Sequence, residues 1–123
     1  MTKKVLDVGN CGPDYSSIKS FIERTFDAKV LQADGPEDTL EILRRDQIDL
    51  VLVNRKLDRD YTDGLEVIKQ IKADDALASV PTMLITNYEE HQQLAKSEGA
   101  VQGFGKLSLQ KPETKDLLQP YLG

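Results

Sequence analysis

The chain has 123 residues, of which 39% are hydrophobic and 30% are charged, and its net charge is −5 at pH 7. These values are typical of a single soluble globular domain over residues 1–123, long enough to bury a core without disulfides or metals. The acidic charge and the lack of a Lys/Arg run exclude an obvious nucleic-acid-binding surface. No apolar run approaches the roughly 20 residues of a membrane span, and the single cysteine, Cys11, excludes an internal disulfide. We therefore expect a cytoplasmic protein with neither nucleic-acid nor membrane partners.

Strand-like and helix-like segments alternate through the first half of the chain. Residues 5–8 form a short apolar run, which meets a cluster of turn-forming residues at 9–13. Apolar residues then recur at near-helical spacing as far as Phe26. A second strand is predicted at residues 29–33, and Pro36 suits the first position of the helix that follows.

The second half continues the alternation. Residues 49–53 are almost entirely apolar, which is typical of a central parallel strand covered on both faces. A polar loop follows this strand and leads to a helix at residues 65–72. The remaining elements are predicted as a strand at 81–86, a helix at 89–97, a fifth strand within 99–109 and a helix at 112–122.

Five repeats of strand and helix predict a parallel sheet with helices on both faces. In such sheets, binding sites form beyond the carboxyl ends of the strands. For this chain, the residues expected at that edge are Gly9, Asn10, Asn54, Thr86 and the region near Lys106.

Several fragments, in this order, resemble the receiver domain of bacterial two-component response regulators. Asp-Gly-Leu-Glu at 63–66 and the helical residues after it resemble the family's third-helix entry. Residues 80–86 resemble its fourth strand with the terminal hydroxyl residue, and Gly99-Ala100 resembles the pair before its fifth strand. The likeness covers nearly the whole chain. It implies a flavodoxin-like α/β fold, namely a doubly wound (βα)5 three-layer sandwich with a five-stranded parallel sheet of order 2-1-3-4-5.

The departures from the family pattern fall on the residues that carry its chemistry. The phosphoacceptor aspartate corresponds to Asn54, and the two acidic metal-binding positions correspond to Gly9 and Asn10. An amide is a very poor nucleophile, and Mg²⁺ depends on carboxylate oxygens. We therefore expect a degenerate pseudo-receiver with no bound metal, no cofactor and no enzymatic activity.

Two further positions of the family's pocket are matched. Thr86 corresponds to its hydroxyl residue, and Lys106 lies at the spacing of its lysine, seven residues after Gly99. Lys111, which precedes a proline as in the family's Lys-Pro pair, is the alternative. Gly103 occupies the position of the family's aromatic switch residue, so a conventional switch is in doubt.

The favoured function is a phosphorylation-independent protein–protein interaction module of two-component-type signalling. Its partner would be a histidine kinase or a downstream signalling protein, and a homodimer is left open. The family commonly binds partners through its fourth helix, fifth strand and fifth helix. The residues expected on this surface are His91, Gln92, Phe104 and Tyr121.

Two alternatives remain open at this stage. The longer loop after Asn54 contains Asp58, Asp60 and Asp63, any of which could serve as a displaced phosphoacceptor. A small-molecule-binding flavodoxin-like domain is the other alternative, although the fold alone does not support it.

Plainer interpretations apply to individual residues. Asn54 could simply cap the strand end through side-chain hydrogen bonds. Asp7, inside the first strand, requires a lysine or backbone partner or a place near the strand edge, because a buried carboxylate is costly without one. Cys11 is expected to be inert, and His91 has no neighbour in the sequence with which it could bind a metal.

Overall fold

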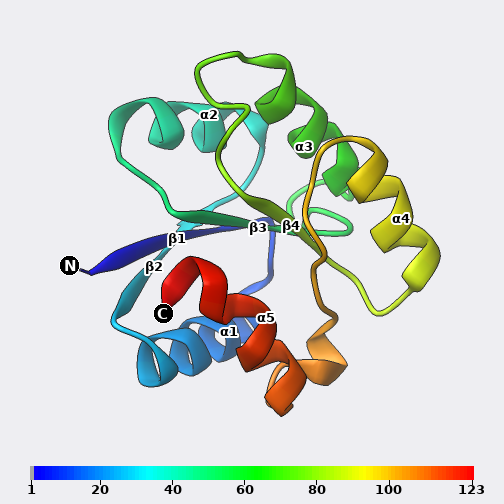
Figure 1. The fold of residues 1–123 in the computed structure, drawn as a ribbon. Helices are drawn as coiled ribbons and strands as arrows, with labels where there is room; N and C mark the ends of the chain where they lie inside the picture. Colours follow the sequence, from blue (N-terminus) through cyan, green and yellow to red (C-terminus); the bar gives the residue numbers. More distant parts are fainter. Residues whose placement is uncertain (1) are drawn as a thin grey trace.

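A four-stranded parallel sheet forms the centre of the protein, whose residues 2–123 are described by a computed structural model. Its strands are β1 (Lys3–Val8), β2 (Ala28–Ala33), β3 (Leu50–Asn54) and β4 (Thr82–Ile85). Their order across the sheet is β2-β1-β3-β4 (Figure 1). After β2 the chain therefore crosses back over β1, and β3 and β4 are added on the other side of β1. Both β1 and β3 have neighbours on each side.

Helices cover the two faces of this sheet as the alternating pattern predicted. One face carries α1 (Gly12–Thr25) and α5 (Pro112–Leu122). The other carries α2 (Pro36–Arg45) and α3 (Gly64–Ala73), and α4 (Glu89–Ser97) lies beside them near β4. The α/β three-layer arrangement is therefore confirmed. Among residues 2–123, no helix is long and apolar enough to cross a membrane.

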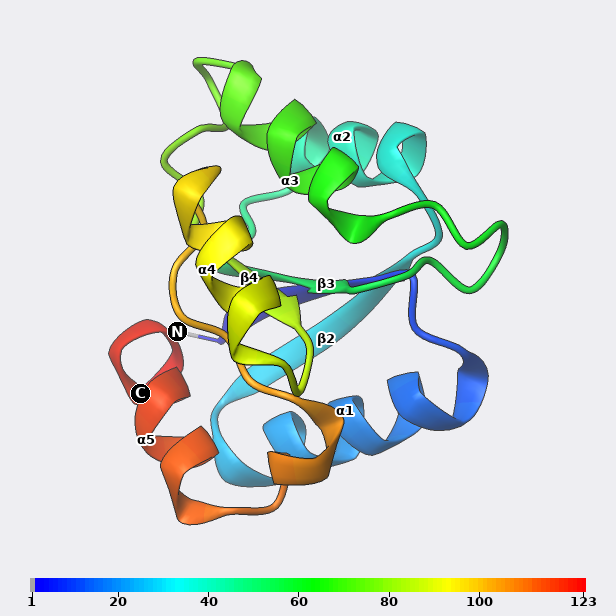
Figure 2. The same ribbon diagram turned by 90° about the vertical axis from the view of Figure 1, so that its right-hand side faces the viewer.

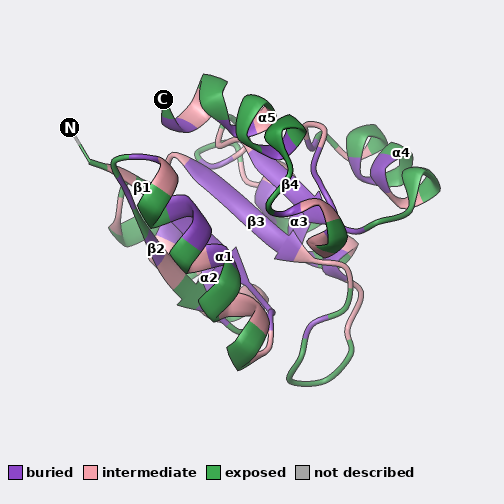
Figure 3. Ribbon diagram, turned by 90° about the horizontal axis from the view of Figure 1, so that it is seen from below, coloured by how far each residue is buried: buried purple, intermediate pink, exposed green. Residues whose placement is uncertain are grey.

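Strand β3 shows why the apolar run at its centre is continuous. Leu50 and Leu52 belong to the core beneath α1 and α5, whereas Val51 and Val53 belong to the core beneath α2 and α3. All four side chains are fully buried (Figure 3). Because successive side chains point to opposite faces, a strand with two covered faces needs an apolar residue at every position.

The expected fifth strand does not form, so the predicted five-stranded sheet of order 2-1-3-4-5 is wrong. The segment after α4 does run beside β4, and Val101 forms a parallel bridge with Met83. The backbone N–H of Val101 donates to Thr82 O at 2.9 Å, and that of Thr86 donates to Phe104 O at 3.1 Å. Between these two contacts the ladder is interrupted.

The side chain of Gln92 in α4 causes this interruption. Its Nε2 donates to Leu84 O at 3.0 Å, and its Oε1 accepts from the N–H of Gly103 at 2.9 Å. The amide thus takes both backbone groups that a regular ladder would pair with each other. Gly103 is needed at this crossing, since a Cβ there would lie 2.2 Å from Leu84 O. The chain then forms a short 3₁₀ helix, η1 (Lys106–Ser108), before α5.

Candidate functional site

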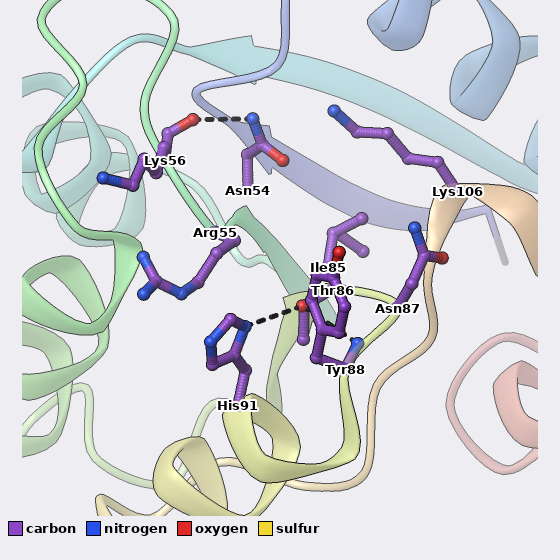
Figure 4. A pocket seen from close by; sticks show the side chains of 9 residues that line it. All are labelled: Asn54, Arg55, Lys56, Ile85, Thr86, Asn87, Tyr88, His91 and Lys106. Atoms are coloured by element: carbon purple, nitrogen blue, oxygen red, sulfur yellow. Dashed lines mark hydrogen bonds between the residues drawn. The ribbon is translucent and has the colours of Figure 1, made fainter.

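A pocket of about 330 Å³ lies at the carboxyl ends of β3 and β4 (Figure 4). It brings together three residues that the sequence predicted at this edge, Asn54, Thr86 and Lys106. Lys111 lies elsewhere, at the N-cap of α5, and lines a neighbouring hollow. The full lining is Asn54, Arg55, Lys56, Ile85, Thr86, Asn87, Tyr88, His91 and Lys106.

Asn54, at the end of β3, directs its amide back to the backbone. Its Nδ2 donates to Lys56 O at 2.7 Å and, more weakly, to Gly9 O at 3.4 Å. This is the strand-end hydrogen bonding that an asparagine in a turn commonly provides. The side chain therefore holds the start of the loop after β3 and brings no negative charge to the pocket.

The loop after β3 closes over the position of Gly9. This loop folds back on itself through a bridge between Lys56 and Asp63, and its tip extends away from the sheet (Figure 3). Leu57 is fully buried against Gly9, whose φ of +79° is a left-handed conformation. A Cβ on Gly9 would lie 2.4 Å from Leu57 Cδ2. The space for a side chain at this position is thus occupied by Leu57, which its place in a polar loop did not predict.

Asn10 and Asp7 form a buried pair beneath the pocket. Asn10 Nδ2 donates to Asp7 Oδ1, and neither Asp7 Oδ2 nor Asn10 Oδ1 has a hydrogen-bond partner among residues 2–123. Burial raises the pKa of Asp7 to about 7, against the opposing effects of the Asn10 hydrogen bond and the Lys106 charge. The hydrogen-bond partner of Asp7 is thus the Asn10 amide and not the expected lysine or backbone group, and Asp7 lies one residue before the end of β1.

Lys106 is engaged by an acidic residue of α1. Its Nζ lies 2.7 Å from Asp14 Oδ2, which also accepts a weak hydrogen bond from Cys11 Sγ at 3.3 Å. The Lys106 hydrogen bond holds the pKa of the Asp14 carboxyl below its usual range. The two partners are 92 positions apart in the sequence, so no local pattern indicates the pair.

Thr86 and His91 are joined on the opposite side of the pocket. The N–H of Tyr88 donates to Thr86 Oγ1 at 3.3 Å, and Thr86 Oγ1 lies 3.1 Å from His91 Nδ1. A hydroxyl has one proton and two acceptor sites, so Thr86 can donate to Nδ1 or accept from it. Donation to Nδ1 places the proton of the neutral ring on Nε2. Tyr88 packs edge-to-face against the same ring, with centroids 5.3 Å apart.

Two of the residues predicted on an interaction surface are buried. Gln92 is 3% exposed because its amide is used between β4 and the 101–104 segment, and Phe104 is 6% exposed because it packs into the core with α1 and α5. Their assignment to the surface is wrong. Tyr121 is partly buried against the same core, and His91 is partly exposed.

The charge of the pocket is the reverse of that expected for a cation site. Arg55, Lys56 and Lys106 line it, and no carboxylate does. Within residues 2–123, there is also no cluster of three or more His, Cys, Asp and Glu residues that could hold a metal ion. The arrangement is suited to neutral or negatively charged groups.

Comparisons with known proteins agree with the α/β fold. Residues 15–121 match the response regulator receiver domain family. The phosphorylated cyanobacterial phytochrome response regulator RcpA superposes with a TM-score of 0.80 at 20% identity, over 98% of this chain and 94% of that one. The receiver domain of a DNA-binding response regulator (merR) from Colwellia psychrerythraea 34H has a TM-score of 0.79 at 21% identity, over 96% of each chain.

A third similar structure is a putative response regulator from Chloroflexus aurantiacus J-10-fl, with a TM-score of 0.79 at 14% identity, over 97% of this chain and 99% of that one. At these identities the superpositions establish the fold. A search of curated proteins found no match.

Proposed function

Because the chain belongs to the response regulator receiver domain family, we propose that it is a pseudo-receiver, which binds protein partners in two-component-type signalling without being phosphorylated. Receiver domains are generally non-enzymatic modules that interact with kinases and effectors. The proposal rests mainly on the residues at the carboxyl ends of β1 and β3, where a receiver's chemistry takes place. Asn54 donates its amide to the Lys56 carbonyl, and Leu57 covers Gly9.

The chemistry of phosphoryl transfer explains why these two features matter. An attacking carboxylate oxygen is required at the acceptor, and a metal ion must neutralise the charge that develops on the phosphoryl group. Asn54 supplies an amide, and the pocket lining contains three cationic side chains and no carboxylate. A divalent cation would therefore meet repulsion where it normally finds ligands.

The acidic residues of the longer loop lie outside the pocket lining. Asp63 caps α3 by accepting from the N–H of Leu65 at 3.0 Å, and it also lies 3.3 Å from Arg55 Nη1. Asp60 accepts from the N–H of Thr62 at 3.0 Å. Neither these carboxylates nor Asp58 line the pocket, which disfavours the displaced acceptor.

The proposal predicts that no phosphoryl group is acquired, even after the acceptor is restored. With acetyl phosphate and Mg²⁺, we expect the protein and its Asn54→Asp variant to keep the unmodified mass, because one carboxylate does not complete a Mg²⁺ site. Intact-protein mass spectrometry, with a conventional receiver as positive control, measures this. A phosphorylated unaltered protein would overturn the proposal, whereas phosphorylation of the variant alone would show that Asn54 is the sole defect.

The surface proposed for partners lies around the start of α4 and η1. Tyr88 is 61% exposed and Leu107 is 81% exposed, and both border a hollow that also contains Lys111. Helix α4, η1 and α5 lie on the same side of the molecule (Figure 2). Exposed aromatic and aliphatic side chains beside a hollow are frequent anchors of protein interfaces.

Loss of these two side chains should weaken partner binding. We expect Tyr88→Ser with Leu107→Ser to reduce binding of the kinase or effector at least tenfold, or about 1.4 kcal/mol. The matched control is Tyr61→Ser, which removes a 75% exposed tyrosine from the loop after β3. Affinity-tagged protein and quantitative pull-down from the native host measure the effect. Equal retention by all three proteins would place the partner surface elsewhere.

A further inference from the structure

We propose that the pocket at the ends of β3 and β4 binds a small oxyanion, a phosphate or carboxylate group, non-covalently and without a metal, through Arg55 and His91. This ligand site adjoins the partner surface, with which it shares Tyr88, and it goes beyond the interaction function proposed above. Figure 4 shows the Arg55 and His91 side chains on one side of the pocket and Lys106 on the other.

Electrostatics favours an anion on the Arg55 side. Lys106 lies 2.7 Å from Asp14 Oδ2 and Arg55 lies 3.3 Å from Asp63 Oδ2, so each of these charges is partly compensated. Lys56, by contrast, has no carboxylate within 4.0 Å among residues 2–123. Asn54 contributes a neutral amide and the lining contains no acidic residue, so the permanently charged side chains of the lining are all cationic.

His91 can present a hydrogen-bond donor to this region. When the Thr86 hydroxyl, which accepts from the Tyr88 N–H, donates to His91 Nδ1, the proton of the neutral ring lies on Nε2. The ring is held in place by this bond and by the edge-to-face contact with Tyr88. A donor fixed in this way loses little conformational entropy when it binds a ligand.

Arg55 supplies the charged donors. Its Nε and Nη1 are buried and have no hydrogen-bond partner among residues 2–123, and the nearest carboxylate oxygen, Asp63 Oδ2, is 3.3 Å from Nη1 without hydrogen-bond geometry. A buried charged donor without an acceptor is costly. Because Arg55 lines the pocket, reorienting its side chain toward a bound oxyanion would give these donors an acceptor. Guanidinium groups suit carboxylate and phosphate groups because their parallel donors match two oxygens.

The size and walls of the pocket agree with a small ligand. A volume of about 330 Å³ is at the lower end of the range for small-molecule sites. Ile85 and the Tyr88 ring form an apolar wall, which lowers the local dielectric and strengthens the interaction of a cation with an anion.

The test is a titration of the ¹⁵N-labelled protein with sodium phosphate, and separately with sodium acetate, in EDTA and against sodium chloride at equal ionic strength. We expect saturable shifts at Arg55, Thr86 and His91 that chloride does not reproduce. Saturation by phosphate alone identifies a phosphoryl ligand, and saturation by acetate as well identifies a general oxyanion site. EDTA keeps the result independent of any metal-dependent phosphorylation.

Variants locate the site. Arg55→Gln and His91→Phe should each weaken binding about tenfold or more, whereas Arg45→Gln, which removes an equal charge from the exposed end of α2, should leave it within about twofold. Amide spectra of the variants report whether the fold is retained. Linear, chloride-like shifts in the unaltered protein, or equal affinities of Arg55→Gln and Arg45→Gln, would overturn the proposal.

Discussion

Asp7→Asn is expected to stabilise the protein by about 2–4 kcal/mol at pH 8 and to change its stability little at pH 4. Asp7 is fully buried in the centre of the sheet, and burial raises its pKa from 3.8 to about 7. A shift of about three pKa units corresponds to about 4 kcal/mol between the two protonation states. Asparagine recovers only part of this, since its amide also lacks a full set of partners.

The sign of the pH dependence follows from the direction of this shift. The folded state binds the Asp7 proton more tightly than the unfolded state, so protonation stabilises the fold. That contribution is fully present below the unfolded pKa of 3.8 and is lost as the pH rises through the folded pKa of about 7. In the unaltered protein, the contribution of Asp7 to the free energy of unfolding therefore decreases between about pH 4 and 7.

Urea unfolding at a series of pH values measures both effects. The matched control is Asp14→Asn, because the Lys106 hydrogen bond lowers the pKa of Asp14 and its stabilising contribution is lost as pH falls. The two substitutions should thus change the pH profile in opposite directions. A parallel profile for Asp7→Asn and the unaltered protein would show that Asp7 has an ordinary pKa.

Gln92→Ala is expected to destabilise the fold by about 2–4 kcal/mol, because each buried backbone group left without a partner costs roughly 1–3 kcal/mol. The groups affected are the Leu84 carbonyl and the Gly103 N–H. Gln92→Glu should be at least as destabilising, since an ionised carboxylate cannot donate to the Leu84 carbonyl. Chemical unfolding at neutral pH measures the change.

The neighbouring glutamine provides the control. Gln93 lies in the same helix, and its side chain makes only an exposed hydrogen bond to Glu89, so Gln93→Ala should change stability by no more than about 0.5 kcal/mol. Hydrogen exchange at Gly103 gives a second measurement, and faster exchange is expected in Gln92→Ala. Undiminished protection with little loss of stability would mean that residues 101–104 pair directly with β4 and complete a fifth strand.

The strands and helices on both faces of the sheet could be predicted from the sequence because each has its own apolar period. Residues 49–53 illustrate this, since unbroken apolar side chains are needed where both faces of a strand are covered. The position of Asn54 and Thr86 at one edge of the sheet was also predictable, because the carboxyl ends of parallel strands meet at the same edge.

The local sequence pattern could not predict that the fifth strand would fail to form, or that another residue would pack against Gly9. Residues 99–109 have strand-like content, but a glutamine from α4 takes the hydrogen-bonding groups that the strand would have used. Leu57 reads as a loop residue, yet it is fully buried on Gly9. In both places a side chain from another segment decides the outcome.

The sequence by itself therefore determined the α/β class, the winding of the chain and the uncharged residues Gly9, Asn10 and Asn54 at the ends of two strands. Only the tertiary structure decided the number of strands, the Asp7–Asn10 pair, and the pairing of Lys106 with Asp14. The physical reason is the distance along the sequence over which each kind of information acts. Periodicity records which face of an element is buried, whereas hydrogen bonds and ion pairs depend on groups that folding brings together from distant parts of the chain.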